Sequence, residues 1–588
     1  MFVGAIDCPH ARECPGCPLI DRSYGAGLAE KRARLVRTVA RFSVLSGLAV
    51  QDAAPADPVV GYRTRSKLVV DGGRVGLYAK GTHAVVDVPE CRVMDPGARE
   101  IVRRLRESPP DAFGLSAIDV RRVGDRFFLT LVVLERADER AVRAYAEELA
   151  RREPSLVSVA MSRRAESAHR VLGDAPAVLV GPSRVAARIR DDGPFHYATP
   201  GAFAQAHAAQ ERALSSEIVA EVARTLDGVE GRTVLELFSG ASALGLELAA
   251  RGARVTAVES FAPAAALARD AAREQHLDVT VEIGDAGRAT KAFRAAGRRF
   301  DAVVVNPPRR GLPADLRADV AALSPRALLY VSCEPATLAR DLADFRRLGL
   351  SARRLQPYDM MPLTEEIETL AALEPSAAPP PDVLFRDGAL VAVVKPPHEP
   401  TTPQGEHAGS LLDRVRLLDG AADAVPVHRL DAGTSGICLF ARNPADVSAL
   451  SRALEAGRKE YTALVRGITH KKGAVGRPLL ENGKERAART RYWRRDVVAG
   501  HSLVDVVTEH GRKHQIRRHL ASIGHPVVGD ARYGDERTNR HFFAQHHLDR
   551  PFLHCGFVRL ERPGAPLELR APLAPDLELC LDALAREK

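Results

Sequence analysis

Four cysteines near the N-terminus have the type and spacing that can hold a metal centre. Cys8, Cys14 and Cys17 lie within ten positions of one another, and Cys91 follows in the segment VDVPECRVMDP. Three cysteines so close together, among prolines and glycines, are rarely unrelated structural residues. Four thiolates can hold either an iron–sulfur cluster or a tetrahedral zinc ion. The spacing alone does not choose between these two.

The segment VLELFSGASALGL, at 234–246, has the pattern of a strand, a glycine turn and a helix. Such a turn lets a ligand approach the backbone closely at the N-terminus of a helix. Glu259 ends the next expected strand, at about the 20-residue separation where a carboxylate can bind ribose hydroxyls. Asp285 ends the strand after that and can meet an adenine. The pattern predicts a nucleoside-containing ligand, with a dinucleotide as the competing interpretation.

A further cysteine stands where a nucleophile would be placed. Cys333 ends the apolar run ALLYVSC, and NPPRRGL follows another such run, DAVVV. Because ligands of parallel sheets bind at the carboxyl ends of the strands, Cys333 is expected to point into the ligand cleft. A buried structural cysteine is the alternative, since burial is common for this residue. The strand-end position favours the nucleophile, and we expect Arg309 and Arg310 to favour its thiolate.

The elements that must position these residues follow two different patterns. From about 200 to 372, short apolar runs alternate with helical stretches, as in a doubly wound α/β sheet. The preceding part, from about 60, consists mostly of short β-rich runs. EPSAAPPPD, at 374–382, is rich in proline and alanine and reads as a linker. A mixed α/β pattern then restarts, and no internal repeat relates the two halves.

Composition narrows the class of protein. The chain has 588 residues, of which 45% are hydrophobic and 27% charged, and it lacks any apolar run long enough to span a membrane. Its N-terminus does not resemble a signal peptide, so a cytoplasmic location is expected. Of the eight cysteines, the first three are bunched within ten positions, unlike a secreted disulfide framework, which would spread them more evenly. The formal charge of +9, rich in arginine, favours a nucleic-acid partner only weakly.

The first 372 residues resemble a known family. The C-x5-C-x2-C spacing, the distant cysteine before a D-P pair and the segment GYRTRSKLVVDGGRVGLYA are similar to the iron–sulfur uracil-C5 methyltransferases of ribosomal RNA. Since the cysteines almost begin the chain, the type without a TRAM domain, which acts on 23S ribosomal RNA, is the most similar. The resemblance implies S-adenosyl-L-methionine as methyl donor and a [4Fe-4S] cluster. It assigns the cluster to Cys8, Cys14, Cys17 and Cys91, and the donor site to Gln205, Phe238, Gly240, Glu259, Asp285 and Asn306.

The chemistry of uracil explains why such a site needs a thiol and a base. C5 of uracil is a poor nucleophile until a thiolate adds to C6 and forms an enolate, which can attack a methyl sulfonium. A base must then remove the C5 proton, and the resemblance assigns that role to Glu368. Glu366 stands where the family usually has a histidine, so repulsion between two carboxylates is expected to raise one pKa. Glu236 and Ser242 also depart from the family pattern, and Ser242 is expected to narrow the glycine turn.

Residues 383–588 resemble a second family. HRLDAGTSG, at 428–436, is similar to the signature of the RluA-type pseudouridine synthases, and KEYTALVRG and GRKHQIRRHL follow in family order. An isolated HRLD is more often a surface salt bridge, but the other two segments make that interpretation improbable. The resemblance makes Asp431 the catalytic carboxylate, Tyr461 the active-site tyrosine and Arg517 the partner that keeps Asp431 ionised. This reaction requires no cofactor or metal.

The leading hypothesis is a bifunctional enzyme that methylates one uridine and isomerises another. We predict domains at 1–60 (Cys-rich), 61–197 (α+β, RNA-binding), 198–373 (Rossmann-like methyltransferase) and 383–588 (mixed α/β synthase), with the linker at 374–382. The expected partner is RNA, most simply 23S rRNA, with tRNA also open for the synthase half, and the chain is expected to act as a monomer without a membrane. The alternative is that one half is a silent RNA-binding module that delivers substrate to the other.

Overall fold

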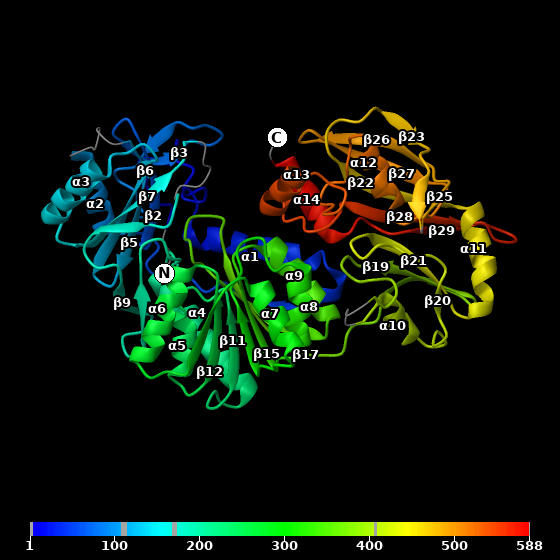
Figure 1. Cartoon of the computed structure of the whole chain (residues 1–588), viewed down its shortest axis with the longest axis horizontal. Helices are drawn as coiled ribbons and strands as arrows, with labels where there is room; N and C mark the ends of the chain where they lie inside the picture. Colours follow the sequence, from blue (N-terminus) through cyan, green and yellow to red (C-terminus); the bar gives the residue numbers. More distant parts are fainter. Residues whose placement is uncertain (1–3, 108–113, 167–172, 405–408, 482, 587–588) are drawn as a thin grey trace.

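The computed structural model describes residues 4–107, 114–166, 173–404, 409–481 and 483–586. Figure 1 shows three sheet-based parts along the molecule, with a β-rich part at one end, a large α/β sheet next to it and a second large sheet at the other end. No helix in these ranges combines the length and the apolar character needed to cross a bilayer. The mixed α/β class predicted from the sequence is confirmed.

The central α/β sheet has eight strands in the order β1-β16-β17-β15-β14-β11-β12-β13. The runs predicted as parallel strands pair in parallel, while β17 runs antiparallel between β15 and β16. The strands are β1 (Ala49–Val50), β11 (Thr233–Leu237), β12 (Arg254–Glu259), β13 (Val279–Ile283), β14 (Ala302–Val305), β15 (Ala327–Ser332), β16 (Leu350–Tyr358) and β17 (Glu368–Pro375).

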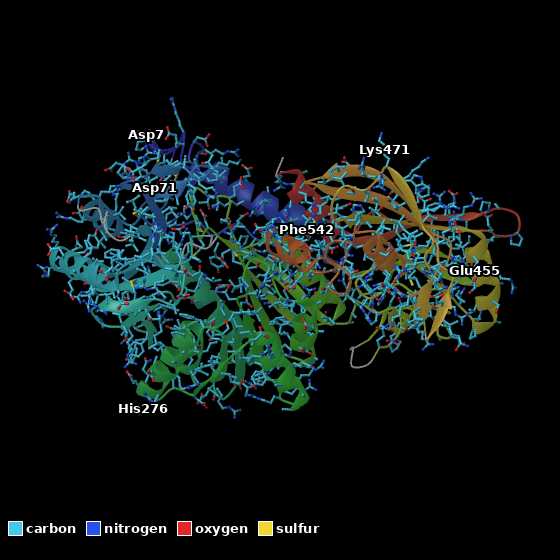
Figure 2. The ribbon with its side chains drawn as sticks, turned by 45° about the horizontal axis from the view of Figure 1, so that its top comes forward. Asp7, Asp71, His276, Glu455, Lys471 and Phe542 are labelled. Atoms are coloured by element: carbon cyan, nitrogen blue, oxygen red, sulfur yellow. The ribbon has the colours of Figure 1, made fainter. Side chains whose placement is uncertain are left out.

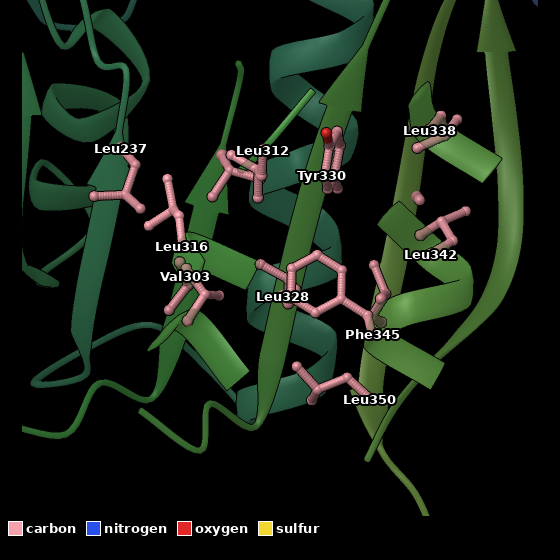
Figure 3. Close-up of a cluster of buried hydrophobic side chains, with 14 of the residues drawn as sticks. Leu237, Val303, Leu312, Leu316, Leu328, Tyr330, Leu338, Leu342, Phe345 and Leu350 are labelled. Atoms are coloured by element: carbon pink, nitrogen blue, oxygen red, sulfur yellow. The ribbon is translucent and has the colours of Figure 1, made fainter. Parts of the chain in front are cut away.

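Helices cover both faces of this sheet because successive strand residues point to opposite sides. Leu235, Val303 and Leu328 face one side, where a core forms with α1, α7, α8 and α9. Figure 3 shows part of this core, including Val303 and Leu328 of the sheet and Leu316 and Leu342 of the helices. Val234, Val304 and Leu329 face the other side, against α4 and α5. The helices are α1 (Tyr24–Ala40), α4 (Ala208–Leu226), α5 (Ala243–Ala249), α6 (Ala262–Glu274), α7 (Ala286–Ala295), α8 (Ala314–Ala322) and α9 (Pro335–Arg347).

Part of the N-terminal segment belongs to this core. Leu35 and Val39 of α1 are buried in the same cluster as α9, and β1 adds a parallel edge strand beside β16. The short 3-10 helix η1 (Ser43–Leu45) connects the two. Residues 24–50 therefore extend the α/β sheet, while Cys8, Cys14 and Cys17 lie in the chain before them.

The β-rich part is a seven-stranded sheet in the order β4-β3-β2-β5-β6-β7-β8, mostly antiparallel with a parallel β6–β7 pair. Helices α2 and α3 contribute to its core. A two-stranded sheet of β9 and β10 follows it. The elements are β2 (Arg65–Asp71), β3 (Arg74–Tyr78), β4 (Val85–Asp87), α2 (Pro96–Glu107), β5 (Leu115–Val123), β6 (Arg126–Leu134), α3 (Glu139–Arg152), β7 (Leu156–Arg164), β8 (Ala177–Val180), β9 (Val185–Arg188) and β10 (Phe195–Ala198).

The C-terminal part is built on a ten-stranded sheet with the main order β18-β19-β21-β28-β22-β27-β26-β23. Its strands are β18 (Asp382–Arg386), β19 (Leu390–Lys395), β20 (Val425–Pro426), β21 (Ser435–Ala441), β22 (Arg458–Val465), β23 (Lys472–Val475), β26 (Thr490–Val498), β27 (His501–Thr508), β28 (Leu553–Leu560) and β29 (Leu567–Arg570), with the separate pair β24 (Leu479–Glu481) and β25 (Lys484–Arg486). Its helices are α10 (Leu411–Arg416), η2 (Pro444–Asp446), α11 (Val447–Ala456), α12 (Gln515–Ser522), α13 (Glu536–Gln545) and α14 (Pro575–Ala585).

Candidate active sites

A cleft of about 1230 Å³ opens at the carboxyl edge of the α/β sheet. The strands β11, β14 and β15 end there, so the loops that follow them bring distant parts of the chain together. The lining includes these residues singled out in the sequence: Gln205, Phe238, Gly240, Glu259, Asn306, Cys333, Glu366 and Glu368. The structure therefore brings the expected donor-binding residues and the expected uracil chemistry into one space.

The glycine turn after β11 is held open by Glu259. Gly240 has a φ of 56°, and its backbone N–H donates to the Glu259 carboxylate at 2.8 Å. The other oxygen of that carboxylate accepts from the backbone of Phe261 at 2.6 Å. No atom lies within 4 Å of the position that a Cβ on Gly240 would take. A ligand can therefore approach the backbone closely at this turn.

Ser242 does not narrow this turn, contrary to the expectation from the sequence. Its side chain is fully buried and donates to the Glu236 carboxylate at 2.5 Å, and Ser242 is absent from the lining of the cleft. Burial raises the pKa of Glu236 to about 7, against the effect of this hydrogen bond. The two departures from the family pattern are thus hydrogen-bond partners, of which Glu236 lines the cleft and Ser242 does not.

Asp285 is the one predicted donor-site residue that does not line the cleft. It caps α7, where its carboxylate accepts from the backbone N–H of Arg288 at 3.0 Å. This contact is the ordinary role of an aspartate at a helix N-terminus. The adenine contact expected for Asp285 stays a prediction.

Cys333 follows β15 and lies in the cleft beside Glu368. Burial and the nearby Glu368 raise the pKa of the Cys333 thiol to about 12, although Arg309 acts in the opposite direction. Arg309 therefore favours the thiolate, as expected, but burial and Glu368 outweigh its effect on the pKa. Arg310 lies instead over the ring of Phe543, 5.2 Å from its centroid.

Glu368 begins β17 and is buried at the same edge. Burial, followed by repulsion from Glu366, raises its pKa to about 7, while Arg309 lowers it. The sequence predicted this repulsion between two carboxylates. Glu366 is itself held by Arg309, with 2.9 Å between the guanidinium and the carboxylate. A base with a pKa near neutrality is well matched to proton removal.

We expect the methylation rate to fall as the pH drops through about 7, because Glu368 accepts a proton only when it is ionised. Glu366→Gln removes the repelling carboxylate and frees Arg309, and both changes lower the pKa of Glu368. The acid limb of the pH–rate profile should therefore move to lower pH. Glu365→Gln, at the exposed neighbouring position, is the matched control. An unchanged acid limb in Glu366→Gln would contradict the assignment of Glu368 as the base.

A second arrangement of charged residues surrounds Asp431, in the loop between β20 and β21. Arg517 of α12 donates to the Asp431 carboxylate at 3.0 Å, as the sequence predicted. Asp530 holds the same guanidinium from the other side, at 2.7 and 2.8 Å, and His514 lies 3.6 Å from Asp431. Sequence reasoning missed both residues as members of this site. Asp530 follows Gly529 in the segment HPVVGD, a position with no recognisable signal of its own.

Tyr461 lies on β22, partly buried against the core that includes Ile516 of α12. Burial and a hydrogen bond with Cys555 raise the pKa of its phenol far above the ordinary value. The two roles that the sequence left open for Tyr461, packing against a base and proton transfer, both stay predictions.

The four predicted cluster ligands, Cys8, Cys14, Cys17 and Cys91, line one small cavity. Burial raises the pKa of Cys17 to about 12, and its three companions act in the same direction while Arg63 opposes them. Within the described ranges, no set of three histidine, cysteine or acidic side chains converges as the ligands of a single ion would. Four cysteine side chains at one cavity are a donor set that a [4Fe-4S] cluster can use. The cluster itself stays a prediction.

Two family models match parts of the chain. Residues 389–522 match the RNA pseudouridylate synthase family, and residues 216–347 match a family described as conserved hypothetical protein 95. The first match contains Asp431, Tyr461 and Arg517, and the second contains the glycine turn and Cys333. The two matches thus fall on the two sites that the geometry separates.

Known proteins similar to the N-terminal part are RNA methyltransferases. An uncharacterized RNA methyltransferase of Geobacter sulfurreducens is 29% identical over 385 residues, which cover 62% of this chain and 76% of the relative. Another, of Halalkalibacterium halodurans, is 28% identical over 386 residues and covers 62% and 82%. The solved tRNA (uracil-54, C5)-methyltransferase of Pyrococcus abyssi, in complex with S-adenosyl-L-homocysteine, shares the fold with a TM-score of 0.50 and 24% identity, covering 61% of this chain and 86% of that one.

The chain therefore joins an RNA methyltransferase-like region to a pseudouridylate synthase domain. Both parts are of the kind found in enzymes that modify RNA.

Proposed function

We propose that this protein methylates C5 of a uridine, in 23S rRNA, and converts another uridine of rRNA or tRNA to pseudouridine. The observation that carries the first activity is the presence of Cys333 and Glu368 in one cleft with the glycine turn. The observation that supports the second is the ion-paired Asp431 within the matched synthase domain. Each site holds the acid–base or nucleophilic group that its reaction requires.

In the methylation, the Cys333 sulfur would add to C6 of the uracil, so that C5 becomes nucleophilic. S-adenosylmethionine, when bound, supplies the methyl group as a sulfonium, and Gln205, Phe238, Gly240, Glu259 and Asn306 would hold it. Glu368 then takes the proton from C5, and the sulfur leaves C6 as the ring double bond reforms. Cys333 must lose its own proton to solvent as it attacks, so that the Glu368 carboxylate stays free to take the C5 proton.

In the isomerisation, Asp431 would start the cleavage of the bond between the sugar and N1 of uracil. It does so either by covalent attack on the sugar or by assisting the departure of the base. Arg517 orients the Asp431 carboxylate, and Asp530 keeps the Arg517 fork in place. The uracil then turns and rejoins the sugar through C5. Both reactions need a base that has left the helical stack, so each target is single-stranded or flipped out.

We also propose that an iron–sulfur cluster is held by Cys8, Cys14, Cys17 and Cys91. This proposal is supported by the cavity that the four side chains share. The proposed methylation transfers no electron, so we assign the cluster to folding and to positioning RNA. We expect anaerobically purified protein to be brown, with iron and sulfide in equal amounts, and Cys17→Ser to lose both. Cys438→Ser, far along the chain in the other half, is the matched control. A preparation with one zinc ion per chain and no iron would contradict this assignment.

The experiment that tests the proposed function is nucleotide-resolution mapping of 5-methyluridine and pseudouridine in total RNA, with and without this protein. Loss of both modifications in a deletion strain supports the two activities. We expect the two targets to lie close together in one RNA, because a short linker gives the second site a high effective concentration. Transfer RNA must be included, since the Pyrococcus abyssi relative acts on tRNA.

A further inference from the structure

A buried ion-pair network joins the synthase domain to the methyltransferase sheet. Asp549 lies in the segment after α13, and its side chain is almost fully buried between the two parts. Phe542, which belongs to α13, is labelled near the middle of Figure 2. The Asp549 carboxylate lies 3.3 Å from Arg317 of α8 and 3.4 Å from Arg340 of α9. His398, within the synthase domain, contacts the other oxygen at 3.1 Å.

The charges of this network balance only when both parts are present. On the methyltransferase side, Arg317, Arg340 and Arg347 face two carboxylates, those of Asp341 and Asp344. Arg317 has no exposed surface, so an unmatched charge there would be costly. Asp549 of the synthase domain supplies a third carboxylate. The junction is therefore specified by buried charge and not by apolar packing alone.

The same two arginines hold the backbone of the loop that follows β14. Arg340 donates to the carbonyl oxygens of Arg310 at 2.9 Å and Leu312 at 3.4 Å. Arg317 donates to the Leu312 carbonyl at 2.5 Å. Arg340 also donates to the carbonyl oxygen of His547, across the junction, at 3.0 Å. Each guanidinium thus links the synthase domain to the loop 309–312 of the methyltransferase.

This loop reaches the methylation site directly. It carries Arg309, which lines the cleft and pairs with Glu366. It also carries Arg310, which Phe543 of the synthase domain covers. Displacement of the loop would move the Arg309 guanidinium, which lowers the pKa of both Cys333 and Glu368, whereas Glu366 raises both. The position of Arg309 is therefore set in part by the synthase domain.

We propose that Asp549 is a positioning residue for methylation: it fixes the arginine pair that holds loop 309–312, so that the synthase domain completes the methyltransferase site. This inference rests on the proposed function and adds a dependence of one site on the other domain. It does not require pseudouridine formation to come first, because the contact is structural. The synthase catalytic loop can be intact while methylation is impaired.

The test compares Asp549→Asn with Asp582→Asn in the full chain. Asp582 of α14 also forms an ion pair across the junction, with Arg41 at 2.6 Å, but both side chains are exposed and remote from the loop. Exposed ion pairs contribute little to the stability of a protein, so Asp582→Asn should methylate RNA like the wild type. In Asp549→Asn we expect methylation to fall roughly 10- to 100-fold, as misplacement of a catalytic site does. Phe543→Ala, at a less buried contact, should give a smaller loss.

The pH–rate profile separates positioning from instability. Because Arg309 lowers the pKa of Glu368, its displacement should move the acid limb of methylation to higher pH in Asp549→Asn. An unstable enzyme would lose rate equally at every pH, and pseudouridine formation by the same sample reports that the synthase domain is folded. Suppose that the wild type methylates RNA, but Asp549→Asn keeps the wild-type rate or loses rate without a shift of its acid limb. That result would overturn this inference and leave the proposed function standing. A wild type that methylates no uridine would overturn the proposed function with it.

Discussion

Replacing Cys333 with alanine is expected to abolish uridine methylation while pseudouridine formation continues. The residue lies in the cleft beside Glu368, and no other cysteine lines that cleft in the part of the chain that the structure describes. Without sulfur addition at C6, C5 of uracil has almost no nucleophilicity. Removal of an enzyme nucleophile commonly costs on the order of 10⁴-fold or more in rate. The loss should therefore exceed that of any variant at the domain junction.

The measurement is transfer of a labelled methyl group to RNA, together with trapping by RNA that carries 5-fluorouridine. Fluorine at C5 cannot be removed as a proton, so Glu368 cannot complete the reaction and the bond from sulfur to C6 persists. Wild-type protein should form this adduct and Cys333→Ala should not. Cys438→Ala, a buried cysteine of the synthase domain, is the matched control and should behave as wild type. Methylation by Cys333→Ala, or an adduct at another cysteine, would remove Cys333 from the mechanism.

The residues that the sequence located correctly stand at the ends of parallel strands. Gly240, Asn306 and Cys333 each follow a short apolar run, and the geometry of a parallel sheet brings such positions to one edge. Sequence alone was sufficient here because the distance between these residues is set by regular hydrogen bonding between strands. Glu366 could be placed near Glu368 for a simpler reason, since Glu368 begins β17 and Glu366 lies two residues before it.

Contacts between distant loops could not be predicted in the same way. Nothing in the order of residues relates Asp530 to Arg517, or Asp549 to Arg340, because those pairs arise from packing of whole elements. The direction of Arg310 is a further example, since its place beside Arg309 predicted a charge near Cys333. Adjacent residues of a loop can point to different sides, and here the synthase domain captures one of them. Likewise, the sequence did not show that Glu236 and Ser242, which both differ from the family pattern, form a hydrogen bond with each other.

Replacing Asp431 with asparagine is expected to abolish pseudouridine formation and to leave methylation intact. Asparagine keeps the size of the side chain and one oxygen for Arg517, so the fold of the loop should be preserved. It removes the negative charge that either route of glycosidic cleavage requires. We expect a loss on the order of 10³-fold or more, comparable to loss of a nucleophile or its ionised partner in other enzymes. Asp423→Asn, at an exposed carboxylate of the same domain, is the matched control.

Arg517→Lys completes this test because it separates charge from geometry. Lysine keeps a positive charge near Asp431 but cannot span Asp431 and Asp530 as the planar guanidinium does. If Asp431 must be held in one orientation, Arg517→Lys should lose roughly 10- to 100-fold in pseudouridine formation, which lies between wild type and Asp431→Asn. If Arg517 only supplies charge, the lysine variant should remain near wild type. Pseudouridine formation by Asp431→Asn at the wild-type rate would exclude this carboxylate from the chemistry and would leave its ion pair with Arg517 a structural contact.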